Sequence, residues 1–214
     1  MKTILLQGDS VTDGRHSREN DNNPGYCYPI FIKGKLDYNF PGEYRLLNRG
    51  IAGNHVADVY ARIQQDIINL KPDVLSILIG VNDVWGFFSG NNTGTEPDKF
   101  CRIYTMLIEE VREKLPDTQI MILEPFILKG KETQENWEPF YVELRKYAAL
   151  IQKIAEKYGL CFVPLQDVFN RAAEQFSPDH WMIDGIHPTV EGAALLAGEW
   201  MKAFWTLEQT HTEA

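Results

Sequence analysis

The chain is poor in basic residues and has no long apolar run. Among its 214 residues, 21 are Lys or Arg and 30 are Asp or Glu, which gives a formal net charge of -9 at pH 7. This charge argues against a nucleic-acid partner and against attraction to an anionic membrane, because no excess of cations is present to neutralise phosphates. No apolar run approaches the roughly 20 residues that a membrane span needs, so we predict no such span.

Cysteine is also scarce. Cys27, Cys101 and Cys161 are odd in number and widely spaced, and they form no disulfide framework. We therefore expect free thiols and a cytoplasmic protein. The first apolar run covers only Ile4 to Leu6, shorter than the roughly 7–15 residues of a secretory signal, so we expect no signal peptide. No grouping of His, Cys and Asp has the spacing of zinc ligands, so we predict no metal.

The residues that are present follow an alternating pattern of strands and helices. The apolar run Val74–Ile79 predicts a strand buried on both faces. Apolar residues at three- and four-residue spacing predict a helix over Val56–Leu70, which Pro72 ends. Strands are predicted over Thr3–Gln7, Tyr44–Asn48, Val74–Ile79, Gln119–Leu123 and Leu160–Val163. Helices are predicted over Tyr28–Leu36, Val56–Leu70, Lys99–Leu115, Trp137–Tyr158, Leu165–Phe176 and Pro188–Leu207.

Five short strands separated by helices predict an α/β fold. Right-handed crossovers would arrange these strands as one five-stranded parallel sheet. No internal repeat, low-complexity tract or linker interrupts the pattern, so we predict a single domain over residues 1–214. The polar stretches Arg15–Pro29 and Trp85–Pro97 are expected to be loops, and the first is a candidate lid over a site.

A serine close to two glycines follows the first predicted strand. The run from Gly8 to Gly14 contains Asp9 and Ser10. The carboxyl ends of parallel strands open into the crevice where α/β proteins bind ligands, so Ser10 would be presented there. Taken alone, the run also fits an ordinary turn.

Later loops, expected at the same edge of the sheet, carry further polar residues and glycine. They contain Gly53 and Asn54, Asn82 and Asp83, and Asp184 and His187. The three-residue spacing of Asp184 and His187 lets the carboxylate reach Nδ1 and leaves Nε2 free to take a proton from Ser10. The backbone N–H groups of Ser10 and Gly53 and the amide of Asn82 are candidate donors to an oxyanion. Asp179-His180 is a rival acid–base pair, and Gly50 is a rival for the role of Gly53.

Four segments resemble the motif blocks of the SGNH hydrolase family, also called GDSL esterases and lipases. They are Gly8-Asp9-Ser10, Asn48 to Asn54 with Gly53, Gly80 to Asp83, and Asp184 to Thr189. The resemblance implies a flavodoxin-like three-layer α/β/α fold and ester hydrolysis without metal or cofactor. It implies Ser10 as nucleophile, His187 as base and Asp184 as its partner, with an oxyanion hole of Ser10, Gly53 and Asn82. The nucleophile elbow of α/β-hydrolases is absent, because Thr12 stands where its second glycine would be.

The predicted function is a serine esterase that hydrolyses small O-acyl esters, with acetyl groups on a carbohydrate as the favoured substrate. The alternatives are a short-chain acyl thioesterase, a lysophospholipase-like activity and a non-catalytic module that binds sugar or acyl groups. The partner is a small-molecule ester, and the sequence leaves open a homo-oligomer. Each aromatic candidate for the pocket also fits simple core packing. The candidate substrate contacts are Asp9, Asn54, Trp85, Phe87, Trp137 and Trp181.

Overall fold

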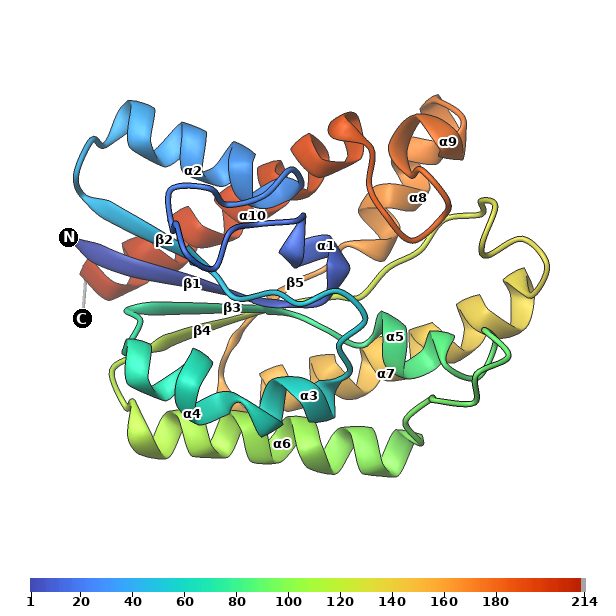
Figure 1. Cartoon of the computed structure of the whole chain (residues 1–214), viewed down its shortest axis with the longest axis horizontal. Helices are drawn as coiled ribbons and strands as arrows, with labels where there is room; N and C mark the ends of the chain where they lie inside the picture. The colour runs from blue at the N-terminus through green and yellow to red at the C-terminus, as the bar shows by residue number, and fades with distance from the viewer. Residues whose placement is uncertain (213–214) are drawn as a thin grey trace.

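A five-stranded parallel sheet forms the middle layer of the computed structural model, which describes the backbone of residues 1–212 and the side chains of residues 1–209 (Figure 1). The strand order is β2-β1-β3-β4-β5. This confirms the predicted parallel sheet, and every strand lies within one residue of its predicted bounds. The strands are β1 (Lys2–Gly8), β2 (Tyr44–Asn48), β3 (Val74–Leu78), β4 (Gln119–Leu123) and β5 (Cys161–Val163).

Helices cover both faces of the sheet and complete the predicted three-layer α/β/α fold (Figure 1). Successive side chains of a strand point to opposite faces. In β1, Leu5 joins the hydrophobic cluster that contains Val59 and Leu107, whereas Ile4 and Leu6 join the cluster that contains Trp200. The first cluster is covered by α3 (Val56–Ala61), α4 (Ile63–Asp66), α6 (Pro97–Lys114) and α7 (Trp137–Tyr158). The second is covered by α2 (Tyr28–Asn39), α8 (Gln166–Gln175) and α10 (Val190–Thr212).

The prediction of one continuous helix over Val56–Leu70 is wrong. The segment breaks at Arg62 and at Ile67 into α3, α4 and the 3₁₀ turn η1 (Ile68–Leu70). Three consecutive short turns keep the apolar spacing of a single helix, so the spacing alone could not reveal the breaks. Three helices were not predicted, because four or five residues are too few to show periodicity: α1 (Ser10–Asp13), α5 (Val81–Trp85) and α9 (Pro178–Trp181).

The strand order fixes where a site can form. The chain reverses its direction of travel across the sheet between β1 and β3, and ligands bind outside the carboxyl ends of the strands at such a point. Gly8 ends β1 there, beside Leu78 of β3. A Cβ on Gly8 would lie 2.3 Å from the carbonyl oxygen of Leu78, so only glycine allows this approach. Asp9 and Ser10 therefore emerge from the middle of the sheet.

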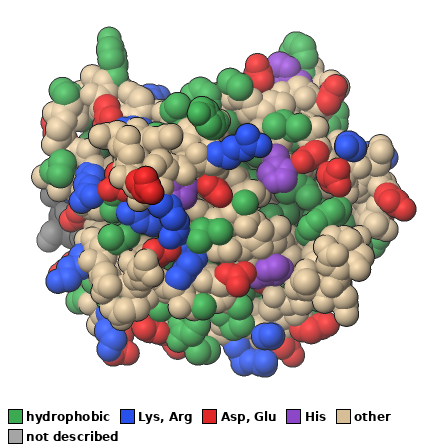
Figure 2. Space-filling model, in the orientation of Figure 1, with side chains coloured by type: hydrophobic (Ala, Val, Ile, Leu, Met, Phe, Trp, Pro, Cys, Tyr) green, Lys and Arg blue, Asp and Glu red, His purple; other side chains and the backbone are tan. Residues whose placement is uncertain are grey.

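Several other predictions concern the whole chain. Cys27, Cys101 and Cys161 are free, as expected. Within residues 1–212, no helix combines the length and the apolar character needed to cross a membrane. The single domain over residues 1–214 stays a prediction, and its last two residues lie outside the described part. Figure 2 shows basic and acidic side chains interspersed on the face that it presents.

Candidate active site

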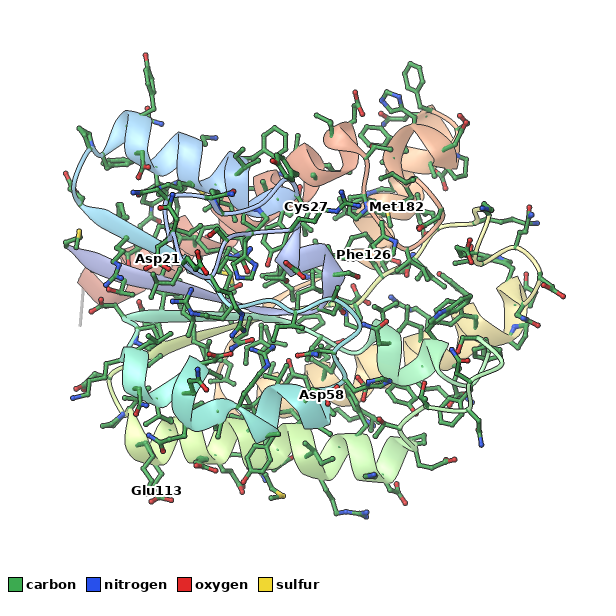
Figure 3. All side chains as sticks on the ribbon, in the orientation of Figure 1. Asp21, Cys27, Asp58, Glu113, Phe126 and Met182 are labelled. Atoms are coloured by element: carbon green, nitrogen blue, oxygen red, sulfur yellow. The ribbon has the colours of Figure 1, made fainter. Side chains whose placement is uncertain are left out.

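Ser10 is the first residue of α1, a single helical turn at the end of β1. Asp9 caps this turn, because its Oδ1 accepts a hydrogen bond from the backbone N–H of Val11 at 3.0 Å. Gly14 ends it in the left-handed conformation, with φ of 49°. The turn places the Oγ of Ser10 2.9 Å from the Nε2 of His187. In Figure 3, Cys27 lies beside α1 at this end of the sheet, whereas Glu113 lies at the opposite end of the molecule.

His187 is held by Asp184 through both its side chain and its backbone. Its Nδ1 lies 2.6 Å from the Oδ2 of Asp184. The other oxygen, Oδ1, accepts the backbone N–H groups of Ile186 and His187, each at 2.8 Å. Gly185 has φ of +101° and a Cβ there would lie 2.5 Å from the Oγ1 of Thr133, so the turn requires glycine. The sequence prediction that Asp184 reaches Nδ1 and leaves Nε2 toward Ser10 therefore agrees with the geometry.

The hydrogen bonds around His187 shift two pKa values in opposite directions. Burial raises the pKa of Asp184, but the hydrogen bonds from His187 and from the backbone of Ile186 outweigh burial and hold this pKa at about 2. The same side-chain hydrogen bond raises the pKa of His187 above its ordinary value of 6.5. Because an ionised carboxylate only accepts hydrogen bonds, Nδ1 carries a proton and the neutral imidazole presents an unprotonated Nε2 to Ser10.

The three predicted oxyanion donors, Ser10, Gly53 and Asn82, each keep an N–H hydrogen without an acceptor in the described part of the chain. The backbone N–H of Ser10 starts α1 and has no acceptor within the helix. Gly53 has φ of +78°, and in the described part of the chain its N–H donates to no other group. The Nδ2 of Asn82 donates to the backbone oxygen of Asn54 at 3.0 Å, which uses one of its two hydrogens. Gly53 follows Ala52, which lines the same cavity as Ser10.

An open cavity of about 620 Å³ lies over Ser10 and His187. The predicted lid loop contributes Arg15, Tyr26 and Cys27 to its wall. Ile183, directly before Asp184, also lines the cavity. The side chains of Tyr26 and Ile183 are largely exposed, at 73% and 69%. Sequence reasoning did not single out these two residues, although Tyr26 lies within the predicted lid loop and Ile183 directly precedes the Asp184 motif.

The structure does not bring the four predicted aromatic residues into the wall of this cavity. Trp85 packs on Phe140, with ring centroids 5.4 Å apart. Trp137 stacks on Tyr141 at 5.1 Å. The ring of Phe87 fills the space over Gly94, where a Cβ would lie 2.6 Å from it.

Trp181 also lies away from the cavity wall, because its Nε1 donates to the backbone oxygen of Ala172 on α8.

The two polar candidates for substrate contact have internal partners instead. Asp9 is buried beside α1, and burial raises the pKa of its carboxyl to about 7. The side-chain oxygen of Asn54 accepts two hydrogen bonds from Arg62. Of the rivals, Gly50 allows a close backbone approach, because a Cβ there would lie 2.4 Å from the N of Asp13.

The second rival, Asp179-His180, lies on α9, and neither of its residues lines the cavity.

The chain is similar in sequence and in fold to known proteins. The model of the GDSL-like lipase/acylhydrolase family matches residues 6–195, a range that includes all four motif segments. An acetylxylan esterase from Geobacillus stearothermophilus is 30% identical over 207 residues, which cover 93% of this chain and 92% of that protein. A crystal structure from Parabacteroides merdae, classed with GDSL-like lipases, is 36% identical with a TM-score of 0.86 and covers 94% of each chain.

The crystal structure of Axe2, an acetylxylan esterase from Geobacillus stearothermophilus, is also similar. It is 29% identical with a TM-score of 0.85, covering 94% of this chain and 93% of that chain. Three further Axe2 structures are of catalytic mutants in which a serine, an aspartate and a histidine are each replaced by alanine. In that protein the aspartate and the histidine stand three positions apart.

Proposed function

The chain belongs to the GDSL-like lipase/acylhydrolase family and is a carboxylic ester hydrolase, and from this premise we propose that it removes acetyl groups from O-acetylated carbohydrates with Ser10 as nucleophile. The observation that carries the proposal is the line of hydrogen bonds from Ser10 to His187 and from His187 to Asp184, at 2.9 and 2.6 Å. The residue types and the spacing match those of the Axe2 catalytic mutants.

In the first step, the Oγ of Ser10 attacks the carbonyl carbon of the ester. Its proton passes to the Nε2 of His187, and the carbonyl electron pair moves to the carbonyl oxygen. His187 becomes an imidazolium, which the carboxylate of Asp184 stabilises across the 2.6 Å contact. The product of this step is a tetrahedral oxyanion bound to Ser10.

The oxyanion needs donors that are already in place when the charge develops. The backbone N–H groups of Ser10 and Gly53 and the second hydrogen of Asn82 Nδ2 supply them in this proposal. Each of these groups lacks an acceptor or keeps one hydrogen free within residues 1–212. Such donors act mainly on the transition state, so they lower the barrier more than they tighten substrate binding.

The oxyanion then collapses, the bond from carbon to the alcohol oxygen breaks, and the imidazolium of His187 gives its proton to the leaving alcohol. This leaves the acyl group on Ser10. A water molecule repeats the attack, with His187 as base, and the carboxylic acid departs while Ser10 recovers its proton. Two similar barriers thus replace one higher barrier.

The acetylated-carbohydrate substrate is supported by the cavity and by the relatives. Two of the relatives are acetylxylan esterases. At the cavity, Tyr26 presents an exposed aromatic ring, and Ala52, Ile183 and Pro188 present apolar side chains. An aromatic ring with apolar neighbours suits the flat face of a sugar, and Ser10 and His187 line the same cavity.

A substrate panel tests the proposal. The kcat/KM values are measured for acetylated xylo-oligosaccharides, a short-chain acyl thioester and a lysophospholipid, with p-nitrophenyl acetate as reference and Ser10→Ala as the blank. We expect the acetylated sugar to give the highest value and Ser10→Ala to give none above background. A higher value for the thioester or for the lysophospholipid would replace the proposed substrate with that class.

A further inference from the structure

The loop after β2, residues 49–54, carries the backbone N–H of Gly53. Hydrogen bonds to the segment that carries Ser10 fix only part of this loop. Its first four residues are tied to the segment that carries Ser10: the N–H of Ile51 donates to the oxygen of Gly8 at 3.1 Å, and the N–H of Ala52 donates to Asp13 Oδ2 at 3.0 Å. Its last two residues, Gly53 and Asn54, make no such hydrogen bond to β1 or α1 in the described part of the chain. A Cβ on Gly53 would meet nothing within 4 Å, so packing does not hold this part of the loop.

The guanidinium of Arg62 donates hydrogen bonds to both ends of this loop. Arg62 lies at the break between α3 and α4, with φ of -109° and ψ of 15°. Its Nη1 donates to the backbone oxygen of Arg49 at 2.8 Å, and its Nε and Nη2 donate to the side-chain oxygen of Asn54 at 3.0 and 2.8 Å. A guanidinium can do this because its donors form a rigid fork, which the flexible ammonium of lysine lacks.

A buried carboxylate fixes the guanidinium in turn. The Nη1 of Arg62 also donates to the Oδ2 of Asp66 at 2.7 Å. The side chain of Asp66 is only 4% exposed. Arg18 reaches the same oxygen at 3.0 Å from a side chain that is 44% exposed, but among the described residues it donates no hydrogen bond to the loop. The hydrogen bond to Asp66, which lies outside the loop, therefore helps to fix the position of the Arg62 guanidinium.

Asn54 connects Arg62 to the side-chain amide of Asn82 through a further hydrogen bond. Its backbone oxygen accepts the Nδ2 of Asn82 at 3.0 Å. Two residues later, the N–H of Val56 donates to Asp83 Oδ2 at 3.1 Å, which ties the start of α3 to α5. One continuous path of hydrogen bonds thus runs from Asp66 through Arg62 and Asn54 to Asn82.

We propose that Arg62 is a positioning residue for the oxyanion hole: its guanidinium clamps the loop of residues 49–54 and so aims the N–H of Gly53 and the amide of Asn82. The inference rests on the proposed function of Ser10, Gly53 and Asn82. Arg62 itself does not line the cavity. Misplacing a catalytic group by about 1 Å costs on the order of 100-fold in rate, so a loosened loop lowers kcat while the cavity that binds substrate stays intact.

The first test is Arg62→Lys, assayed on p-nitrophenyl acetate. We expect kcat to fall by about 10- to 100-fold, with KM changed less than about threefold. The acid limb of the pH profile should keep its midpoint, because Arg62 touches neither His187 nor Asp184. Arg18→Gln is the matched control: it removes the other cation on Asp66 and should leave kcat unchanged. An Arg62→Lys variant with unchanged kcat, or one whose pH midpoint moves, overturns the proposal.

A double-mutant cycle keeps the proposal testable even where Arg62→Lys folds poorly. Asn54→Ala removes the acceptor that Arg62 holds, and we expect a similar loss of kcat. Because Arg62 acts mostly through Asn54, the double variant should lose no more than about threefold beyond the larger single loss. Losses that multiply fully would show independent roles and contradict the clamp, as would wild-type kcat in Asn54→Ala. A wild-type protein without esterase activity would instead contradict the proposed function.

Discussion

The Oγ of Ser10 lies 2.9 Å from the Nε2 of His187, although 177 positions separate the two residues in the chain. Ser10 is placed by the capped turn at the end of β1, and His187 by the turn that Asp184 and Gly185 form before α10. The two turns are built independently, so their contact depends on the packing of α10 against the sheet to which β1 belongs. The chemistry of the site therefore depends on the fold as a whole.

The pH dependence of the enzyme should follow His187. Turnover needs an unprotonated Nε2, and the hydrogen bond that His187 donates to Asp184 raises the pKa of His187 above 6.5. The value of kcat/KM should therefore fall as the pH is lowered, with its midpoint above pH 6.5. Asp184→Asn removes the carboxylate that raises the pKa of His187, so the midpoint should move to lower pH. The value of kcat should also fall by roughly 10³- to 10⁴-fold. A midpoint that stays in place would show that another group controls the acid limb.

Asn82→Ala should lower kcat by roughly 10²- to 10³-fold on p-nitrophenyl acetate, because one oxyanion donor is lost. The change in KM should be small, since the donor acts mainly in the transition state. Asn170→Ala is the control, because the amide of Asn170 donates to the hydroxyl of Tyr141 outside the cavity. If Asn82→Ala raises KM and leaves kcat intact, Asn82 binds substrate and is not part of the oxyanion hole.

Asp9→Asn should change how stability depends on pH. Burial raises the pKa of Asp9 from 3.8 to about 7 in the folded protein. Between pH 3.8 and about pH 7, the folded chain keeps the carboxyl of Asp9 protonated, whereas the unfolded chain has released that proton. The free energy of unfolding therefore falls as the pH rises through this range. The fall is at most about 1.4 kcal/mol for each pH unit. Asn cannot titrate, so the difference between variant and wild type should grow from pH 4 to pH 7 and then level off.

Urea titrations at several pH values measure this difference. The amide oxygen of Asn can still accept the N–H of Val11, so the cap of α1 is retained. A difference in the free energy of unfolding that stays constant with pH would show that Asp9 ionises in the folded protein near its ordinary pKa.

Tyr26→Ala should separate large from small substrates. Tyr26 lines the cavity and is 73% exposed as a residue, so it can contact a sugar but is not needed to hold the fold. We expect KM for acetylated xylo-oligosaccharides to rise by about 10-fold, as expected for the loss of one aromatic contact, and KM for p-nitrophenyl acetate to stay close to that of wild type. Tyr38→Ala, on the outer face of α2 and 86% exposed, is the control. Equal KM values for wild type and Tyr26→Ala on the oligosaccharide would remove Tyr26 from the substrate site.

The sequence allowed the sheet and the central site geometry to be predicted for a physical reason. Buried strands such as β3 are short apolar runs, and α7 ends at Gly159, a residue suited to the left-handed conformation found there, with φ of 63°. The contact between Asp184 and His187 is local, so their spacing was informative.

The sequence could not distinguish an aromatic side chain that packs inward from one that lines a cavity. Trp85 and Trp137 border predicted loops as a pocket residue would, yet Trp85 packs on Phe140 and Trp137 stacks on Tyr141, both in α7. The contact between Arg62 and Asn54 was also out of reach, because it depends on the break between α3 and α4 that apolar spacing did not reveal.

The most direct test of the account is covalent labelling of the nucleophile. The protein is treated with a fluorophosphonate, which reacts with activated serine hydroxyls, and the labelled residue is located by mass spectrometry of its peptides. We expect one label, on Ser10, formed quickly in the wild type and lost in His187→Ala, whereas Arg18→Gln should label like the wild type. A label on another residue, or labelling of Ser10 that does not depend on His187, would contradict the proposed mechanism.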